Sequence, residues 1–340
     1  MNSRNAADCE VIMEAKKTKE NWFASFGRNI LAGLKTNGGI IIGLIIICII
    51  LGIMTDSFLT VRNFTNIMRQ ISINVILACG MTMVIILGGI DLSVGSIIAI
   101  SGCLCCGLIT NEGMPAYAAI PISILAGTLV GIFNGFVVSR TTIPPFIVTL
   151  AMMNIGRGFA RIYTKATTIL VDDEVFTFIG SGTVLGGIPI HIVYMVVVIA
   201  VSALILNRTK LGRNIYAVGD NKQAASYSGI HAKRVTMTVF VLMGFFAACA
   251  GIISSARTFS GQFNVGEGAE MDAISAVVLG GTSMSGGIGH LSGTIIGCIV
   301  IGVLNNGMNI LGIDSSWQYV VKGVVVLLAV FIDYFKKIRE

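Results

Sequence analysis

The run NGGIIIGLIIICIILGIM, Asn37 to Met54, contains 18 residues and no charged side chain. A helix of about 20 such residues crosses the roughly 30 Å hydrocarbon core of a bilayer, so the run predicts a membrane span. The preceding residues, 1–36, carry charges of both signs between Glu14 and Glu20. Because they are too many and too acidic for a cleaved signal peptide, we expect an uncleaved anchor behind a cytoplasmic tail.

Similar apolar runs recur through the rest of the chain, from residue 37 to residue 340. Hydrophobic residues make up 54% of the sequence and charged residues 12%, where a soluble domain carries roughly 25% charged residues. This composition predicts an all-α, polytopic transmembrane helix bundle without a separate soluble domain. We place ten spans near 37–55, 70–90, 93–110, 116–138, 146–163, 190–206, 235–256, 270–286, 289–311 and 318–335.

The distribution of charge predicts which side of the membrane each loop faces. The cations gather in the N-terminal tail, in residues 207–234 and in the C-terminal FKKIRE, as the positive-inside rule describes for cytoplasmic segments. Ten spans then return both termini to the cytoplasm, and the net charge of +6 requires no nucleic acid as a partner. Residues 164–189 become a long external loop that a partner could contact. Arg62, Arg69 and Arg157 do not fit this scheme and indicate that some spans are interfacial or broken.

No set of residues in the chain is typical of an enzyme or a metal site. The three histidines are far apart, and the eight cysteines lack the paired spacing of zinc ligands. The GxxxxGK[ST] phosphate loop does not occur in the sequence, so the chain does not bind ATP through that motif, and we expect it to carry no cofactor of its own. If the protein uses ATP, a separate subunit must hydrolyse it.

Two glycine-rich segments resemble each other. LGGIDLSVG at residue 87 aligns with LGGTSMSGG at residue 279. The match is explained equally by an internal duplication and by two unrelated glycine-rich helix contacts. A duplication would fit transporters whose binding site lies between two halves of the fold.

Polar residues inside or beside the predicted spans are candidates for function, because a charged group at membrane depth costs roughly 2.5 to 3.5 kcal/mol on insertion scales. We expect Asn134, Asn154, Asn305 and Asn309 to line a solute path, although interhelical hydrogen bonding is the alternative for each. Asp91 and Lys322 are structural or gating candidates. Asp91 could cap a helix ahead of Leu92 or serve the path. Lys322 could reach the interface or pair within the protein, with Asp314 and Gln318 nearby.

The basic segment 207–234 contains the pattern of one short helix. In GDNKQAASYSGI, Asp220 is the predicted N-cap, Gln223 completes a capping box and Gly229 ends the helix. A helix of two turns is marginal alone in water, so this one needs packing against its own protein or a partner. The alternative is a solvated loop held at the lipid headgroups. The candidate docking residues are Asp220, Asn221, Gln223, Ala224, Ala225, Ser228 and Gly229.

Four motifs resemble the permease subunit of bacterial ABC sugar importers of the ribose and galactose type. They are GGIDLSVGSIIAISG (88–102), LGRNIYAVGDNKQAASYSGI (211–230), MDAISAVVLGGTSMSGGIG (271–289) and LNNGMNILGIDSSWQYVVKGVVVLLAVFID (304–333). The resemblance extends from about residue 40 to the C-terminus. Residues 305–312 and 277–287 are most similar to the ribose branch.

The resemblance implies a multi-pass protein of the bacterial inner (plasma) membrane that works by alternating access. Its implied partners are a second permease copy, identical or different, a cytoplasmic ABC ATPase that holds ATP and magnesium, and a periplasmic sugar-binding protein. The helix near Asp220 to Ser228 would be the coupling helix that the ATPase binds.

Other functions remain open. A secondary sugar or solute carrier would need buried acids, which are sparse here. A membrane enzyme or scaffold would need a convergent set of catalytic residues. Within the same family, another hexose or a furanose autoinducer is an alternative to ribose.

Overall fold

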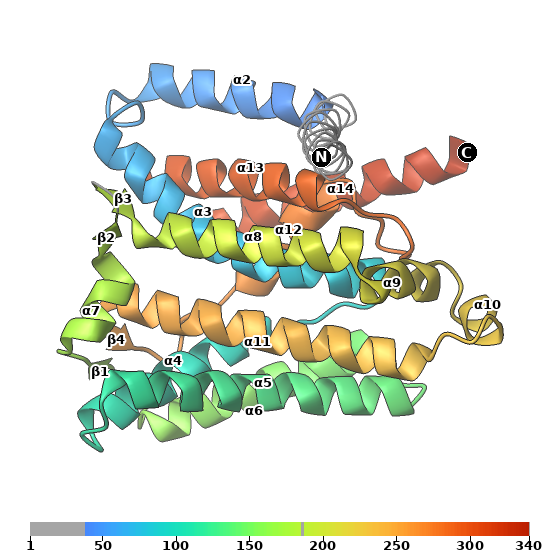
Figure 1. Cartoon of the computed structure of the whole chain (residues 1–340). Coiled ribbons are helices and arrows are strands. Elements are labelled where there is room, and N and C mark those ends of the chain that lie inside the picture. The colour runs from blue at the N-terminus through green and yellow to red at the C-terminus, as the bar shows by residue number, and fades with distance from the viewer. Residues whose placement is uncertain (1–37, 185–186, 340) are drawn as a thin grey trace, which may run out of the picture.

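The computed structural model describes residues 38–184 and 187–339, which are helical almost throughout (Figure 1). The helices are α2 (Gly38–Met54), α3 (Val61–Ile86), α4 (Val94–Thr110), α5 (Ala116–Arg140), α6 (Pro145–Tyr163), α7 (Glu174–Ser181), α8 (Ile190–Arg208), α9 (Lys210–Asp220), α10 (Lys222–Tyr227), α11 (Ala232–Thr258), α12 (Ala269–Leu279), α13 (Leu291–Ile310) and α14 (Ser315–Arg339). The predicted helix bundle is therefore confirmed. The predicted tail, 1–36, lies outside the described residues.

Two small antiparallel pairs of strands complete the fold. β1 (Ile169–Leu170) pairs with β4 (Ser260–Gly261), and β2 (Thr183–Val184) pairs with β3 (Ile188–Pro189). The first pair joins the predicted external loop to the end of α11. The described part of the loop 164–189 is thus folded, with α7 at its centre and Asp173 capping α7 through the Phe176 amide.

Five helices of the described chain are long and apolar enough to cross a membrane, namely α3, α5, α8, α11 and α13. The helices α2 and α4 are also apolar and have 17 residues each. The predicted span 270–286 is wrong, because α12 ends at Leu279. Its 11 residues make a helix only about 16 Å long, roughly half of a bilayer core. The expected count of ten full spans is therefore not confirmed.

The long helices lie side by side, and the connecting segments gather at two opposite ends (Figure 1). One end carries α9 and α10, together with the start of α2 and the end of α14. The other end carries α7 and strands β1, β2 and β3. The basic segment and the loop 164–189 are therefore separated by the length of the bundle.

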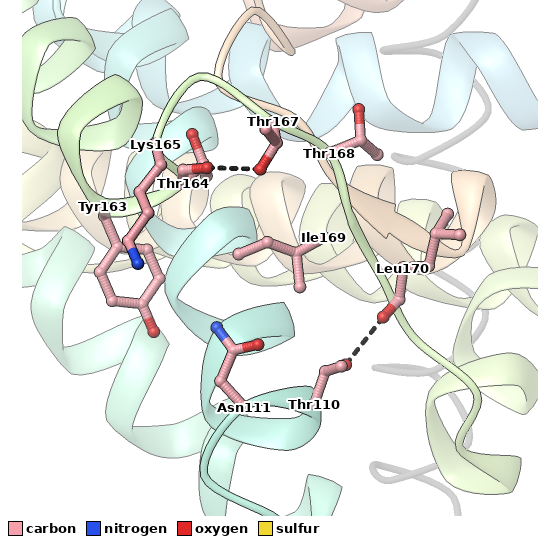
Figure 2. Close-up of a pocket in the computed structure, with 9 residues that line it drawn as sticks. All are labelled: Thr110, Asn111, Tyr163, Thr164, Lys165, Thr167, Thr168, Ile169 and Leu170. Carbon is pink, nitrogen blue, oxygen red and sulfur yellow. Dashed lines mark hydrogen bonds between the residues drawn. The ribbon is translucent and has the colours of Figure 1, made fainter.

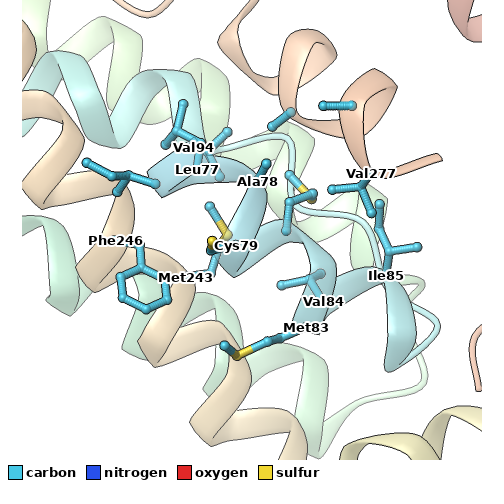
Figure 3. Packing of buried hydrophobic residues seen from close by; sticks show 14 of the residues in the cluster. Leu77, Ala78, Cys79, Met83, Val84, Ile85, Val94, Met243, Phe246 and Val277 are labelled. Atoms are coloured by element: carbon cyan, nitrogen blue, oxygen red, sulfur yellow. The ribbon is translucent and has the colours of Figure 1, made fainter. Parts of the chain in front are cut away.

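The helix α3 is the centre of the core (Figure 3). Its side chains Leu77, Cys79 and Met83 are fully buried and belong to one hydrophobic cluster with Met243 of α11 and Val277 of α12. By contrast, most residues of α5 and α8 are not buried within the chain. Lipid tails are as apolar as the side chains of these helices, so exposure to the bilayer carries no penalty.

Glycines set how closely α5 and α11 approach. Gly131 of α5 and Gly244 of α11 face each other, and a Cβ on Gly131 would lie 2.9 Å from the Gly244 Cα. Helices associate in lipid mainly through such close backbone packing. These two glycines therefore form the crossing point of the pair.

The two similar glycine-rich segments lie in two breaks between helices, one joining α3 to α4 and the other joining α12 to α13. Both preceding helices end with the same three backbone hydrogen bonds, and Gly88 and Gly281 have φ values of +84° and +85°. These glycines differ by one residue from the sequence alignment, which pairs Gly88 with Gly280. The same bonds also end α10 and α13, so they do not decide between duplication and coincidence.

Candidate functional site

The segment that follows α8 forms a helix that the sequence analysis missed. Thr209 caps α9 by accepting a hydrogen bond from the Gly212 amide at 3.2 Å. Gly212, Ile215 and Val218 then recur at three-residue intervals and are buried against the bundle. The helix α9 thus lies against α3, α8 and α11, and its far end leads directly into α10.

The predicted N-cap of the docking helix is off by one residue. Asp220 still belongs to α9, and the first extended residue is Asn221, with φ of −150° and ψ of 102°. Its side-chain oxygen accepts from the Gln223 amide at 3.0 Å and the Ala224 amide at 2.9 Å. Asp and Asn cap helices about equally well, so local sequence could not choose between them.

The end of α10 agrees with the prediction that Gly229 stops the helix. Gly229 has a φ of +82°, and the Ile230 amide donates to the Ala225 carbonyl at 3.0 Å. The Ser228 amide donates to Ala224, which completes the arrangement common at helix C-termini. Local hydrogen bonds therefore define both ends of this six-residue helix.

Only one of the two predicted docking alanines is available to a partner. Ala225 is 5% exposed and packs into the core, whereas Ala224 is exposed. Tyr227 is 91% exposed, the largest apolar surface on the helix. We define the outer face of α10 as the exposed residues on the side away from Ala225: Gln223, Ala224, Ser226 and Tyr227.

A buried polar cluster holds the break between α3 and α4. Asp91 is fully buried, and its Oδ1 accepts from the Ser93 amide at 2.9 Å and the Ser93 hydroxyl at 2.6 Å. Asn134 of α5 donates to the Ser93 Oγ at 2.9 Å. Asp91 is therefore not the cap of a helix that begins at Leu92, because α4 starts at Val94 after Ser93. Sequence reasoning missed Ser93, which links the two predicted residues.

A second cluster joins α12, α13 and α14. The Lys322 ammonium lies 2.9 Å from Asp272 Oδ1, and Asn305 donates to Asp272 Oδ2 at 3.1 Å. Lys322 therefore pairs within the protein, but not with the residues expected. Gln318 donates instead to Asn309 Oδ1 at 2.9 Å. Asp272 was missed because it is distant in sequence and reads as an ordinary acid in the first turn of a helix.

The four asparagines predicted to line a path do not meet within this chain. Asn134 and Asn305 are buried in the two clusters, while Asn154 and Asn309 are exposed. The Asn154 amide donates only to the Leu150 carbonyl of its own helix. Asn306, which also lies in a predicted span, forms two hydrogen bonds with Asn63 of α3.

Arg157 has a structural role that explains its place in a span. Its guanidinium donates to the carbonyls of Phe263 at 2.8 Å and Val265 at 2.7 Å. These residues lie in the irregular segment between β4 and α12. Non-helical backbone at membrane depth must find partners inside the protein. Arg157 of α6 donates to two carbonyls of this segment and so ties it to α6 just before the half-length helix α12.

At the end of the bundle that carries α7, a cavity of about 430 Å³ opens between α4, α6 and β1 (Figure 2). Thr110 donates to the Leu170 carbonyl and Thr167 to the Thr164 carbonyl, so these hydroxyls hold the wall together. Lys165 turns the chain with a φ of +52°. The lining consists of Thr110, Asn111, Tyr163, Thr164, Lys165, Thr167, Thr168, Ile169 and Leu170.

Comparisons with known proteins agree on one family. The family model "Branched-chain amino acid transport system / permease component" matches residues 63–330. The chain is 43% identical to the ribose import permease protein of Haemophilus influenzae, covering 86% of this chain and 92% of the relative. It is 44% identical to the ribose import permease protein of Bacillus subtilis, covering 88% and 94%. The D-allose transport system permease protein of Escherichia coli is 37% identical over 85% and 88%. No solved structure matches the chain.

The family model covers most of the helices described above, including both breaks, both polar clusters and α10. It also confirms the predicted transport role and agrees with the multi-pass arrangement of apolar helices. The chain therefore belongs to the family of membrane permease components described as "Branched-chain amino acid transport system / permease component", and it is similar to sugar permeases within 86 to 88% of its length.

Proposed function

We propose that the chain is the membrane-spanning permease subunit of an ATP-driven importer for a monosaccharide, with a ribose-like pentose as the substrate. The ribose import permeases are 43 and 44% identical to the chain. The relatives named for D-allose, L-arabinose and xylose are 37, 34 and 34% identical. This difference over nearly the whole chain favours the ribose branch.

The energy would come from a cytoplasmic ABC ATPase that binds ATP and magnesium and docks on the outer face of α10. The exposure of that face is the observation that carries this part of the proposal. A six-residue helix is marginal alone in water, and caps at both ends hold α10 in place. Tyr227 is 91% exposed on this helix, so the outer face is available to a partner. Lys210 and Arg213 of α9 and Lys222 of α10 favour a cytoplasmic position for this end of the bundle.

Two further partners complete the proposed importer. A second permease copy, identical or different, would form the other half of the membrane unit. A periplasmic sugar-binding protein would contact the opposite end of the bundle, where α7 and the strands fold the loop 164–189 into a defined surface. Alternating access between the two ends would then move the sugar.

A secondary carrier is the second candidate, and Asp91 is the observation that favours it. A fully buried carboxylate, held by Ser93 on one oxygen, is a group that proton-coupled carriers use. The two functions differ in their energy source, so one assay separates them.

The test is uptake of labelled ribose into proteoliposomes that contain the permease, its ATPase and its sugar-binding protein. We expect accumulation that requires ATP and all three proteins, and competition by ribose stronger than by D-allose, L-arabinose or xylose. Accumulation driven by a proton gradient with the permease alone would contradict the proposal and support the carrier.

A further inference from the structure

Three segments that are far apart in the sequence converge at the C-terminal end of α9. We call this place the glycine junction, and define it as Ile86–Gly88 from the α3–α4 break, Gly219–Asp220 at the end of α9, and Gly286–Gly289 from the α12–α13 break. The Gly287 amide donates to the Ile86 carbonyl at 2.8 Å, which ties the two breaks to each other. One helix end therefore meets both breaks at once.

The contact between α9 and the breaks is made by backbone atoms. A Cβ on Gly219 would overlap the Ile86 carbonyl oxygen and lie 2.8 Å from the Gly287 amide nitrogen. In the other direction, a Cβ on Gly286 would lie 2.7 Å from the Gly219 carbonyl oxygen. No side chain separates these surfaces, so a displacement of α9 cannot be absorbed by a change of rotamer.

Tyr216 adds a directional bond one turn earlier in α9. Its hydroxyl donates to the Gly289 carbonyl at 2.8 Å. Burial raises the pKa of Tyr216, so the phenol keeps its proton at physiological pH and remains a donor. Tyr216 therefore contacts the α12–α13 break at Gly289, and Gly219 contacts the same break at Gly286 and Gly287.

Each break leads to one of the buried polar clusters. The α3–α4 break continues into Asp91 and Ser93, which Asn134 of α5 holds. The α12–α13 break ends the half-length helix α12, which carries Asp272. Movement at the junction would thus reach both buried polar clusters.

We propose that the last turn of α9, Tyr216 to Asp220, transmits movement of the docked helix α10 to both breaks together, with Tyr216 and Gly219 as its positioning residues. This inference rests on the proposed function, because it assumes an ATPase that moves α10. Only Asn221 separates α9 from α10, and Ala225 of α10 packs into the same core. The two helices therefore move as one body, and the glycine junction is the place where that body touches the membrane helices.

The experiment compares three variants in proteoliposomes with the ATPase and the sugar-binding protein. Gly219→Ala introduces the overlap with Ile86, and Tyr216→Phe removes one hydrogen bond without changing shape. Gly158→Ala is the matched control, because a Cβ on this α6 glycine meets nothing within 4 Å. The readouts are binding of the ATPase, the rate of ATP hydrolysis, and the number of sugars moved per ATP.

For Tyr216→Phe we expect normal ATPase binding and hydrolysis, with sugars moved per ATP reduced about threefold to tenfold by the loss of one hydrogen bond. Gly219→Ala should reduce the ratio further, and Gly158→Ala should leave it unchanged. If Gly219→Ala fails to fold, Tyr216→Phe decides alone.

Two results would overturn the inference. One is an unchanged ratio of sugar to ATP in Tyr216→Phe, and the other is loss of ATPase binding in that variant, which would make Tyr216 part of the docking surface. The proposed function fails in a different way, when the unaltered permease shows no ATP-dependent uptake in the same assay.

Discussion

The Lys322 ammonium lies 2.9 Å from Asp272 Oδ1, across the interface between α14 and the half-length helix α12. Their side chains are 16% and 12% exposed, so both charges are largely withdrawn from solvent. This ion pair anchors a helix that is too short to cross the membrane.

Removing one charge of this pair should destabilise the protein. In Lys322→Met the Asp272 carboxylate keeps only the Asn305 amide, and breaking a buried pair costs about 3 kcal/mol. We expect a lower midpoint of thermal unfolding in detergent. The double variant Asp272→Asn with Lys322→Met should recover part of the loss, and a single variant as stable as the parent would show that the pair contributes nothing.

Asn134 is buried and Asn154 is exposed, so alanine variants of the two asparagines form a matched comparison. Asn134→Ala removes the donor to Ser93 beside a fully buried Asp91 and should cost about 1 to 3 kcal/mol. Asn154→Ala removes an exposed amide and should change stability by less than about 0.5 kcal/mol. Thermal unfolding of the two variants side by side tests this, and equal losses would contradict the assigned role of Asn134.

The prediction of a solute path through asparagines is separate from stability. Alanine at Asn305 or Asn309 should reduce ATP-driven sugar uptake after correction for the amount of folded protein. Asn309 is the sharper case, because it is exposed and its replacement leaves the core intact. Unchanged uptake in both variants would remove these residues from the path.

Tyr227 should contribute most to ATPase binding on the outer face of α10, and Tyr227→Ala tests this. Tyrosine is enriched among the few residues that dominate binding, and its loss should weaken ATPase binding by about 2 kcal/mol, or roughly 30-fold. Tyr117→Ala is the control, because Tyr117 is likewise exposed, at 75%, but lies at the start of α5 and not on α10. Equal ATPase affinity for both variants would mean that α10 does not dock.

Two substitutions should uncouple ATP hydrolysis from transport while leaving membrane insertion intact. Ala224→Glu places a charge on the outer face of α10, which is exposed in the chain alone. Gly229→Pro is incompatible with the φ of +82° that ends the helix, since proline fixes φ near −65°. Uptake at the parental rate in both variants would contradict the docking role.

Arg157 holds backbone carbonyls, whereas Arg161 makes a contact at the surface, so variants of the two arginines compare these kinds of contact. Arg157→Leu leaves the Phe263 and Val265 carbonyls without their donor, so we expect a loss of about 2 to 3 kcal/mol in stability. Arg161 lies over the Phe263 ring at 5.6 Å and is exposed, so Arg161→Leu should cost less than about 1 kcal/mol. A larger loss for Arg161→Leu would show that the segment between β4 and α12 is held differently.

Local patterns in the sequence predicted most of the helices and the end of α10. The length of an apolar run predicts a membrane span whatever the run packs against. Glycine readily adopts the positive φ that ends a helix, so Gly229 predicted the end of α10. The same reasoning failed for residues 270–286, because the uncharged run continues past Leu279 while the backbone turns at Gly281. It also failed for α9, whose charged residues suggested a loop.

The sequence by itself determined that this chain is a membrane helix bundle with a basic end and a short capped helix, because hydropathy, charge and caps are local properties. Only the tertiary structure decided which polar groups meet: Asp272 with Lys322 across 50 residues, Asn134 with Ser93 across 41, and Tyr216 with Gly289 across 73. Such pairs depend on how helices pack, and a low-dielectric interior makes each unpaired group costly enough to fix its partner. The glycine junction belongs to the same class, since three glycine-containing segments become one contact only when the chain folds.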